Sequence, residues 1–537
     1  MSRGRGGALS GIDRCTGAFF IFAASFYLIR IPLYALIGAD GAARLIPALE
    51  LFVLFYASFV LAGTVTMRRC VRTRRLRRRT ASIPGFVSAA GLPTLLAGLI
   101  LAVLLAALPT PAAGVLGADR NMFLLFVCLA PSILFLSITG ILRGYEEGML
   151  VFGGSFLCYL AEAALTAAGA LIGGRLAYNY GVKAAALLRN PSVAAIYGAF
   201  GAALGISAAS LISLLLQLGC HLLSRGTIRE YLESREELKG EPENLSDIRR
   251  AYWSSFLLTA AAFFLLTAPV LTDYRLSFHF SSLQDAQTRL LWASFGSKAL
   301  PPVVMAALLL ILPFPGFPAR LGWYLADRNR KEFRREFGIL MRLAGYLLIP
   351  VSFFFMAASH IITSIGFGID DKTAETALAF DAPAVYFLGI ALLLVMLYLS
   401  VQDLTRLLLF TLAAYAVQTA LCIMLLLLHV SPELSGAVSF LVFTILLSAL
   451  LLFGFYGAAL RRNRWVRETV MAALCAVAAA IPVFLLSVPL YDYIGALPAL
   501  LVLGVLYLAV YVLLTIFLRV CDLRELHRIP GGDMIVM

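Results

Sequence analysis

Charged residues are scarce in this chain. Asp, Glu, Lys and Arg make up 14% of its 537 residues, whereas hydrophobic residues make up 61%. An average globular protein has about 25% charged residues, so this composition excludes a large soluble domain. The eight cysteines and five histidines are scattered without metal or redox spacing, which leaves no sign of a metal site. Because there is also no nucleophile elbow or phosphate loop, the sequence does not indicate an enzyme or a cofactor.

Long apolar runs fill most of the chain instead. Runs of about 20 residues match the hydrocarbon thickness of a bilayer when they form helices, which predicts an all-α polytopic membrane protein with 14 transmembrane helices. The first run is full length and carries Arg30, so it does not resemble a cleavable signal. The predicted spans are centred near residues 26, 56, 96, 131, 161, 208, 262, 301, 352, 392, 417, 448, 479 and 506.

The basic residues predict the orientation. Most of the 43 Lys and Arg fall between spans on one side, including an arginine block at Arg68–Arg79. Loops rich in Lys and Arg stay in the cytoplasm, so we expect both termini inside a plasma membrane. The net charge of +13 follows from this topology and does not indicate nucleic acid. We interpret the arginine block as a topogenic segment that faces lipid headgroups, with partner binding as the alternative.

The longest polar interruption divides the spans into two sets of six. Residues 1–223 are predicted to form an N-lobe, 224–250 a charged cytoplasmic linker, 251–460 a C-lobe, and 461–537 two further spans and a cytoplasmic tail. Both lobes begin inside the cell, so the repeat must be parallel, with a pseudo-two-fold axis along the membrane normal. Two such lobes around a central cleft predict a transporter that works by alternating access.

Arg30 lies inside the first span, two residues before a proline. A charge in a span costs roughly 2.5–3.5 kcal/mol on insertion scales, so it usually has a partner or a polar cavity. Glu50 lies at a similar depth, because the turn between the first two spans falls near Ala39–Asp40. Two interpretations therefore stay open: Arg30 binds a polar ligand, or it forms a structural ion pair with Glu50.

Three segments carry a resemblance to a known family. They are LIRIPLYALIGADG at Leu28–Gly41, LRGYEEG at Leu142–Gly148, and Leu300-Pro301 with the basic loop that follows. Together they resemble the polysaccharide-exporter branch of the multidrug/oligosaccharidyl-lipid/polysaccharide (MOP) exporter superfamily, which includes Gram-positive lipid II flippases and stage V sporulation protein B. The arginine block and Glu50 depart from the family pattern.

The resemblance implies a flippase that moves an undecaprenyl-pyrophosphate-linked saccharide, such as the peptidoglycan precursor lipid II, to the outer leaflet. Arginine suits such a substrate because guanidinium binds phosphate oxygens bidentately and stays charged. The coupling to Na⁺, H⁺ or membrane potential, the oligomeric state and any cell-wall synthesis partners stay open. Among the candidate head-group residues, Arg30, Arg289 and Lys298 are expected to share one cationic patch, and Arg14 and Arg143 are expected to receive the head group first, as entry residues at the cytoplasmic ends of their spans. The candidates for orienting these bases or binding a coupling cation are Glu50, Glu162 and Asp285.

Some of these candidate residues can also have purely structural roles. Arg289 and Lys298 can extend to the membrane surface, and Glu162 can hydrogen-bond between helices. The alternative functions are a cation-coupled multidrug exporter of the same superfamily, a membrane glycosyltransferase or polymerase, and a non-transporting scaffold in cell-wall or spore assembly. A glycosyltransferase should show a large outer loop with clustered carboxylates, whereas the longest predicted outer segments carry only Asp273 and Asp285.

Overall fold

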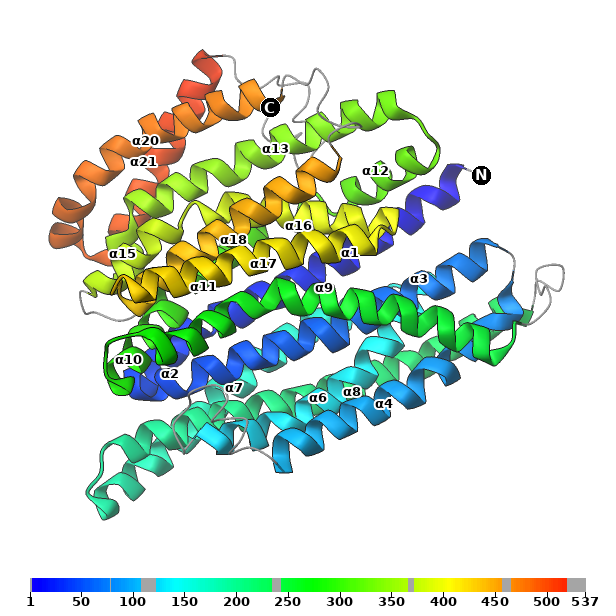
Figure 1. Cartoon of the computed structure of the whole chain (residues 1–537), viewed down its shortest axis with the longest axis horizontal. Helices are drawn as coiled ribbons and strands as arrows, with labels where there is room; N and C mark the ends of the chain where they lie inside the picture. The colour runs from blue at the N-terminus through cyan, green and yellow to red at the C-terminus, as the bar shows by residue number, and fades with distance from the viewer. Residues whose placement is uncertain are drawn as a thin grey trace. The chain divides into compact units, whose positions relative to one another are not determined.

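The computed structural model describes residues 2–77, 79–107, 122–233, 243–365, 371–455 and 465–518. Throughout these ranges the regular structure is helical (Figure 1). Thirteen helical runs within them are long and apolar enough to cross a membrane. The prediction of an all-α polytopic membrane protein is therefore confirmed.

The chain divides into two compact units, Met1–His279 and Phe280–Met537. The helices of the first unit are α1 (Ser2–Leu28), α2 (Arg30–Phe55), η1 (Tyr56–Leu61), α3 (Ala62–Leu76), η2 (Thr80–Ser82), α4 (Ile83–Ala107), α6 (Phe123–Gly148), α7 (Gly153–Leu188), α8 (Ser192–Glu233) and α9 (Leu245–Phe280). Those of the second unit are α10 (Asp285–Ser294), η5 (Phe295–Ala299), α11 (Leu300–Leu310), α12 (Gly316–Ala326), α13 (Arg330–Ala357), α14 (Ser359–Ser364), α15 (Lys372–Asp381), α16 (Ala384–Val401), α17 (Leu404–Leu427), α18 (Pro432–Gly454), α20 (Trp465–Ile494) and α21 (Ala496–Phe517).

The first helical run, Gly11–Leu76, contains two of the predicted spans. It breaks at Gly38, whose backbone has φ +72° and ψ 177°, a conformation that glycine adopts without a steric penalty. Arg30 and Glu50 are joined by an ion pair, although twenty residues of straight helix would separate them by about 30 Å. The chain therefore reverses at Gly38, one residue before the predicted turn.

Each of the other twelve runs covers one predicted span. The total of fourteen spans and the pseudo-two-fold relation of the lobes stay predictions. Side-chain caps fix several helix starts. Asn329, Asp371 and Asp403 each accept a hydrogen bond from a backbone N–H in the first turn of the helix that follows, as good N-cap residues do.

Glycines bring α7 and α8 into close contact. A Cβ atom added at Gly201 or Gly205 would overlap the carbonyl oxygen of Gly173 or Gly169 on the other helix. Small residues at such spacing let membrane helices approach until their backbones touch. Gly201 and Gly205 therefore serve helix packing, and α7 and α8 form a tightly packed pair.

Helix α9 packs within the first unit. Ile248 lies under Gly85 of α4, and Phe256 meets Phe59 of η1 edge to face, with 6.0 Å between ring centroids. The predicted lobe boundary at residues 224–250 places this helix in the C-lobe, and that division stays a prediction.

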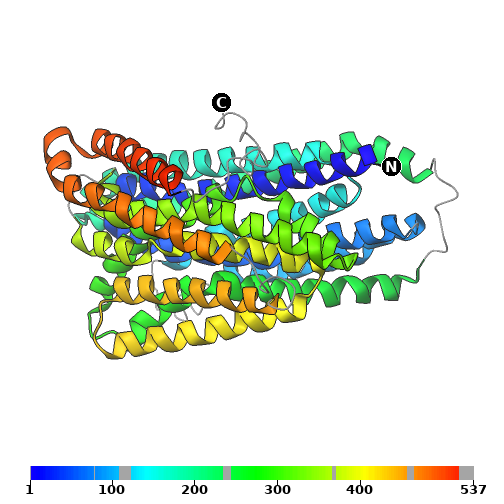
Figure 2. The ribbon, with the colours of Figure 1, turned by 90° about the horizontal axis from the view of Figure 1, so that it is seen from above.

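In the second unit, α20 and α21 lie side by side (Figures 1 and 2) and pack on α13 and α14 around a buried cluster. Tyr511 donates a hydrogen bond to the carbonyl oxygen of Tyr346, and Tyr346 donates one to Thr515. Tyr507 and Tyr511 stack in parallel. The two C-terminal helices are thus held to the unit by aromatic contacts and by tyrosine hydroxyls with partners.

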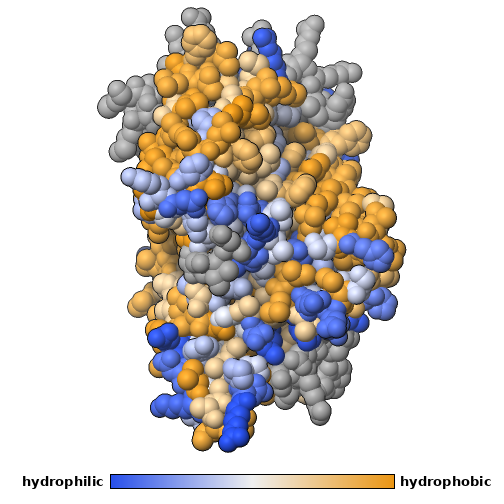
Figure 3. Space-filling view, turned by 90° about the vertical axis from the view of Figure 1, so that its left-hand side faces the viewer, coloured by the Kyte–Doolittle hydropathy of each residue, from blue (hydrophilic) through white to orange (hydrophobic). Residues whose placement is uncertain are grey.

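Large apolar side chains cover much of the surface. Leu223, Phe484 and Val505 are among many that are exposed, and Figure 3 shows broad hydrophobic areas with hydrophilic groups between them. A soluble monomer rarely exposes apolar patches of this extent, whereas a bilayer covers them. This surface agrees with the candidate spans, so the chain is a multi-pass membrane protein.

Candidate functional site

Arg30 and Glu50 form a buried ion pair in the first unit. Nη1 of Arg30 contacts Oε1 of Glu50, and the two side chains are 0% and 3% exposed. The Arg30 guanidinium also lies over the ring of Tyr27, 4.1 Å from its centroid, a favourable cation–π arrangement. The ion pair considered in the sequence analysis is present, and its existence leaves the ligand role of Arg30 open.

Arg30 retains hydrogen-bonding capacity after this pairing. Its Nε and Nη2 are buried and have no hydrogen-bond partner among the described residues. A guanidinium has five N–H donors, and a buried donor without a partner carries a desolvation cost of about 1–3 kcal/mol. An acceptor brought to these atoms would therefore bind to groups that are already removed from water.

An aromatic column continues from this pair along α1 and α2. Phe26 stacks on Phe52 with 5.2 Å between centroids, and one turn further Phe22 meets Tyr56 at 5.0 Å. The hydroxyl of Tyr56 lies 3.5 Å from Nη1 of Arg143. The column thus separates two buried arginines at different depths in one unit.

Arg143 is surrounded by polar and aromatic groups of three other elements, α7, α8 and η1. Its Nη2 lies 2.6 Å from Oε2 of Glu162, its Nε donates to Oε1 of Gln217 at 3.1 Å, and its guanidinium lies 4.1 Å from the Tyr159 ring centroid. Arg143 and Glu162 are both fully buried. Like Arg30, Arg143 combines a glutamate partner with a covering aromatic ring.

A second layer of polar residues surrounds this arginine. Gln217 donates from Nε2 to Oε2 of Glu146 at 2.9 Å, and Ser155 donates to the same oxygen at 3.3 Å. His221 Nδ1 lies 3.2 Å from Glu146 Oε1, and the adjacent Glu147 accepts from Arg68 at 2.9 Å. The LRGYEEG segment is therefore the centre of a buried polar network. Buried groups of this kind are stable only when they are paired.

Most residues of this network were not predicted from the sequence. Glu146 and Glu147 lie in a recognised segment, and two adjacent carboxylates at the end of an apolar span were a usable signal. Gln217 and His221 carried no such signal, because their partners lie more than seventy residues away along the chain.

The predicted entry residues occupy different environments. Arg14 is exposed on α1, whereas Arg143 is completely buried and held by Glu162. For Arg143 to receive a head group, Glu162 must first release it. Its role as an entry residue stays a prediction with this added requirement.

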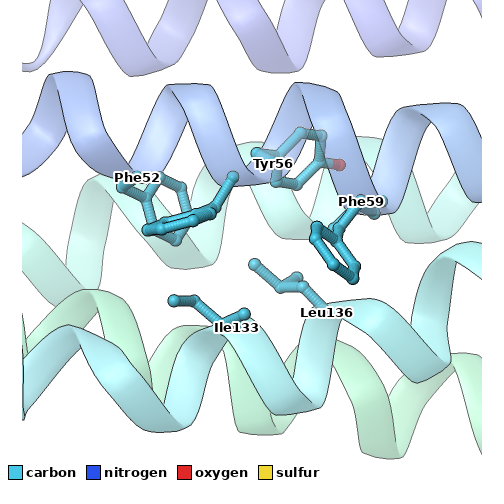
Figure 4. Close-up of a pocket in the computed structure, with 7 residues that line it drawn as sticks. Phe52, Tyr56, Phe59, Ile133 and Leu136 are labelled. Carbon is cyan, nitrogen blue, oxygen red and sulfur yellow. The ribbon is translucent and has the colours of Figure 1, made fainter. Parts of the chain in front are cut away.

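A small apolar pocket lies beside the column, between α2–η1 and α6 (Figure 4). The rings of Phe52, Tyr56 and Phe59 face Ile133 and Leu136 across it. Segment η1 is a π-helical turn, and such turns are frequent at functional sites. The Tyr56 hydroxyl is the only polar side-chain group among the lining residues. This pocket is therefore suited to an apolar group.

The second unit contains another buried cation, Lys298, in the π-helical segment η5. Its Nζ donates to Oδ2 of Asp371 at 2.9 Å, and its side chain is 4% exposed. Ser294 also donates to Oδ2 of Asp371, and Thr373 donates to Oδ1 at 2.6 Å. Burial acts to raise the pKa of Asp371, but these hydrogen bonds and the Lys298 charge hold it well below its usual range. Asp371 was not predicted, because seventy-three residues separate it from Lys298.

The remaining candidates lie on α10, where Asp285 is exposed and Arg289 is partly buried. The patch that Arg30, Arg289 and Lys298 are expected to share stays a prediction. The residues described contain no group of three or more His, Cys, Asp and Glu side chains arranged to hold a metal ion. Two of the carboxylates considered for cation binding, Glu50 and Glu162, are paired with arginines.

Several solved structures resemble this fold. A lipid II flippase, MurJ, in an inward closed conformation has a TM-score of 0.63 at 14% identity, over 94% of this chain and 98% of that one. The eukaryotic MATE transporter AtDTX14 gives 0.60 at 12% identity, over 87% and 99%. An inward-facing multidrug resistance MATE family transporter of the MOP superfamily gives 0.58 at 12% identity, over 81% and 94%. No family model matches the sequence, and no curated protein sequence matches it.

These likenesses cover nearly the whole of each neighbour, so the chain shares the fold of these three proteins. At 12–14% identity the likeness extends to the fold alone.

Proposed function

We propose that the chain is a flippase for an undecaprenyl-pyrophosphate-linked saccharide, with the peptidoglycan precursor lipid II as the substrate. It would act in the plasma membrane with both termini in the cytoplasm. The two lobes would alternate access to a central cleft while the lipid tail stays in the bilayer. No covalent step is required, so the residues act by binding and release.

The free donors of Arg30 carry this proposal. A fully buried guanidinium with Nε and Nη2 unpaired is suited to an anionic oxygen ligand, and a pyrophosphate offers several such oxygens. Glu50 would hold the arginine in place between substrates. The fold supports the proposal in general terms, since MurJ is among its structural neighbours.

A cation-coupled multidrug exporter is the second candidate, because MATE transporters share the fold at similar TM-scores. The chemistry of Arg30 favours the flippase, since its unpaired groups are donors on a cation and would repel a positively charged drug. Whether Na⁺, H⁺ or the membrane potential drives transport is left open by both proposals.

The test is depletion of the protein in its own cells, in a strain without a second flippase, with a leaflet-specific assay for lipid II. We expect lipid II to accumulate in the inner leaflet. A normal rate of appearance in the outer leaflet would contradict the proposal. Efflux of a cationic dye, measured in the same cells, tests the exporter alternative.

Reconstituted protein adds a test of the residue. Arg30→Lys keeps the positive charge but removes the planar donor set that binds phosphate oxygens in pairs. We expect the rate of lipid II flipping in proteoliposomes to fall about tenfold, the effect of roughly 1.4 kcal/mol. Arg175→Lys, at an exposed position of α7, is the matched control. Equal rates of lipid II flipping for the two variants would show that Arg30 does not bind the substrate.

A further inference from the structure

The arginine block at Arg68–Arg79 holds an anion supplied by the chain itself. Arg74 donates to Oε2 of Glu243 from Nε at 3.3 Å and from Nη2 at 3.0 Å. Arg79 donates from Nη1 to Oε1 of the same carboxylate at 3.1 Å. Two arginines therefore bind the two oxygens of one carboxylate, in the paired geometry that guanidinium also forms with phosphate.

The surrounding contacts fix this arrangement. The backbone N–H of Glu243 donates to the hydroxyl of Ser82 at 2.9 Å. The Arg74 guanidinium lies over the ring of Phe86, 4.8 Å from its centroid. Next to it, Arg75 donates to the hydroxyl of Tyr231 at 2.8 Å. The site is thus built from the end of α3, the start of α4, and residues that precede α9.

Within the described part of the chain, one carboxylate does not neutralise this site. Arg74 and Arg79 contribute two positive charges against one negative charge, and Arg72 and Arg77 are exposed nearby on the same segment. Burial acts to raise the pKa of Glu243, but the hydrogen bonds and charges of the two arginines lower it below its ordinary value. The carboxylate is therefore the charged form that the arginines stabilise, and positive charge remains for a more highly charged anion.

The position of the site favours a lipid as the source of that anion. It lies between two candidate spans, one ending at Leu76 and the next starting at Thr80. Residues so close to the ends of two spans lie at the level of lipid headgroups. Arg79 is 54% exposed, so an incoming phosphate can reach the site.

We propose that Arg74, Arg79 and Ser82 form a binding site for the phosphate of an anionic lipid headgroup, which Glu243 occupies in this structure and leaves when the lipid binds. Glu243 then acts as an internal competitor. The site is separate from Arg30, and it does not depend on which substrate the protein transports.

The experiment measures binding to the purified full-length protein in neutral detergent micelles. Short-chain phosphatidylglycerol, short-chain phosphatidylcholine and inorganic phosphate are titrated separately, with microscale thermophoresis as the readout. The variants are Glu243→Gln, Arg79→Gln and Arg74→Gln. Glu230→Gln, an exposed carboxylate on α8, is the control for loss of one negative charge.

We expect Glu243→Gln to bind phosphatidylglycerol about tenfold more tightly than the unchanged protein, which corresponds to about 1.4 kcal/mol. Glu230→Gln should leave the affinity within about twofold, and Arg79→Gln should weaken it about tenfold. Arg79 is largely exposed, so its variant should fold even if Arg74→Gln does not. Equal affinities of Glu243→Gln and Glu230→Gln for phosphatidylglycerol would show that Glu243 does not compete with the lipid. If inorganic phosphate binds as tightly as phosphatidylglycerol, the site does not select the phosphate of a lipid.

Discussion

A double-mutant cycle on Arg30 and Glu50 separates a structural ion pair from a ligand site. The variants are Arg30→Gln, Glu50→Gln and the two combined. Each single change leaves one charge buried without its partner, because neither side chain is more than 3% exposed. Breaking a buried pair in this way costs about 3–5 kcal/mol, whereas removing both charges costs much less.

We therefore expect each single variant to unfold at a lower denaturant concentration and the double variant to recover most of the loss. Lipid II flipping in proteoliposomes should follow a different pattern. The double variant folds but lacks the unpaired Nε and Nη2 of Arg30, so its flipping should stay at least tenfold below that of the unchanged protein.

Two results would refute the reasoning. If the double variant flips lipid II at the normal rate, Arg30 is a structural residue only. If the double variant is as unstable as the sum of the single variants, the two charges do not interact as a pair. Glu332→Gln and Arg335→Gln form the control cycle, because their side chains are 3.7 Å apart and 35% and 58% exposed. Exposed pairs of this kind contribute less than about 1 kcal/mol.

Three further predictions concern stability in detergent, followed as the midpoint of thermal unfolding. Because the pKa of Asp371 is lower in the folded chain than its ordinary value, the stabilisation it provides is present above about pH 4 and is lost as the pH falls towards the folded value. Asp371→Asn should therefore lower the midpoint at pH 7 and make its acid dependence weaker, and an unchanged acid profile would contradict this. Gly205→Leu should prevent α7 and α8 from packing and cost more than about 3 kcal/mol, while Gly219→Leu, where an added Cβ meets no atom within 4 Å, should cost under about 1 kcal/mol. Gly38→Ala should cost about 1–3 kcal/mol, since the backbone conformation at this position (φ +72°, ψ 177°) is one that essentially only glycine adopts. A midpoint equal to that of the unchanged protein would show that the turn relaxes.

Hydropathy and charge were sufficient to predict the helical spans, because each span satisfies its own backbone hydrogen bonds and needs only local sequence. The partner of Arg30 was also predictable. Equal distances from one turn place Arg30 and Glu50 at one depth, and a buried arginine needs a carboxylate or a ligand.

The remaining contacts of the site depend on packing between distant helices. Nothing local in the sequence links Arg143 to Glu162 and Gln217, or Lys298 to Asp371. Rotation of each helix about its axis decides which residues face each other, and this rotation is set by features such as the Gly–Gly contacts of α7 and α8. The π-helical segments η1 and η5 change that rotation further. A sequence pattern based on 3.6 residues per turn predicts neither segment.

The arrangement around Arg30 affects the thermodynamics of ligand exchange. The arginine is already dehydrated and its charge is already balanced by Glu50, so a phosphate that binds to Nε and Nη2 approaches a cation that is largely neutralised. The hydrogen bonds gained by these two donors are offset by the loss of water from the phosphate and by its repulsion from the Glu50 carboxylate. A binding site of this kind holds its cargo weakly, and weak, reversible binding is what a carrier needs in order to release on the far side of the membrane.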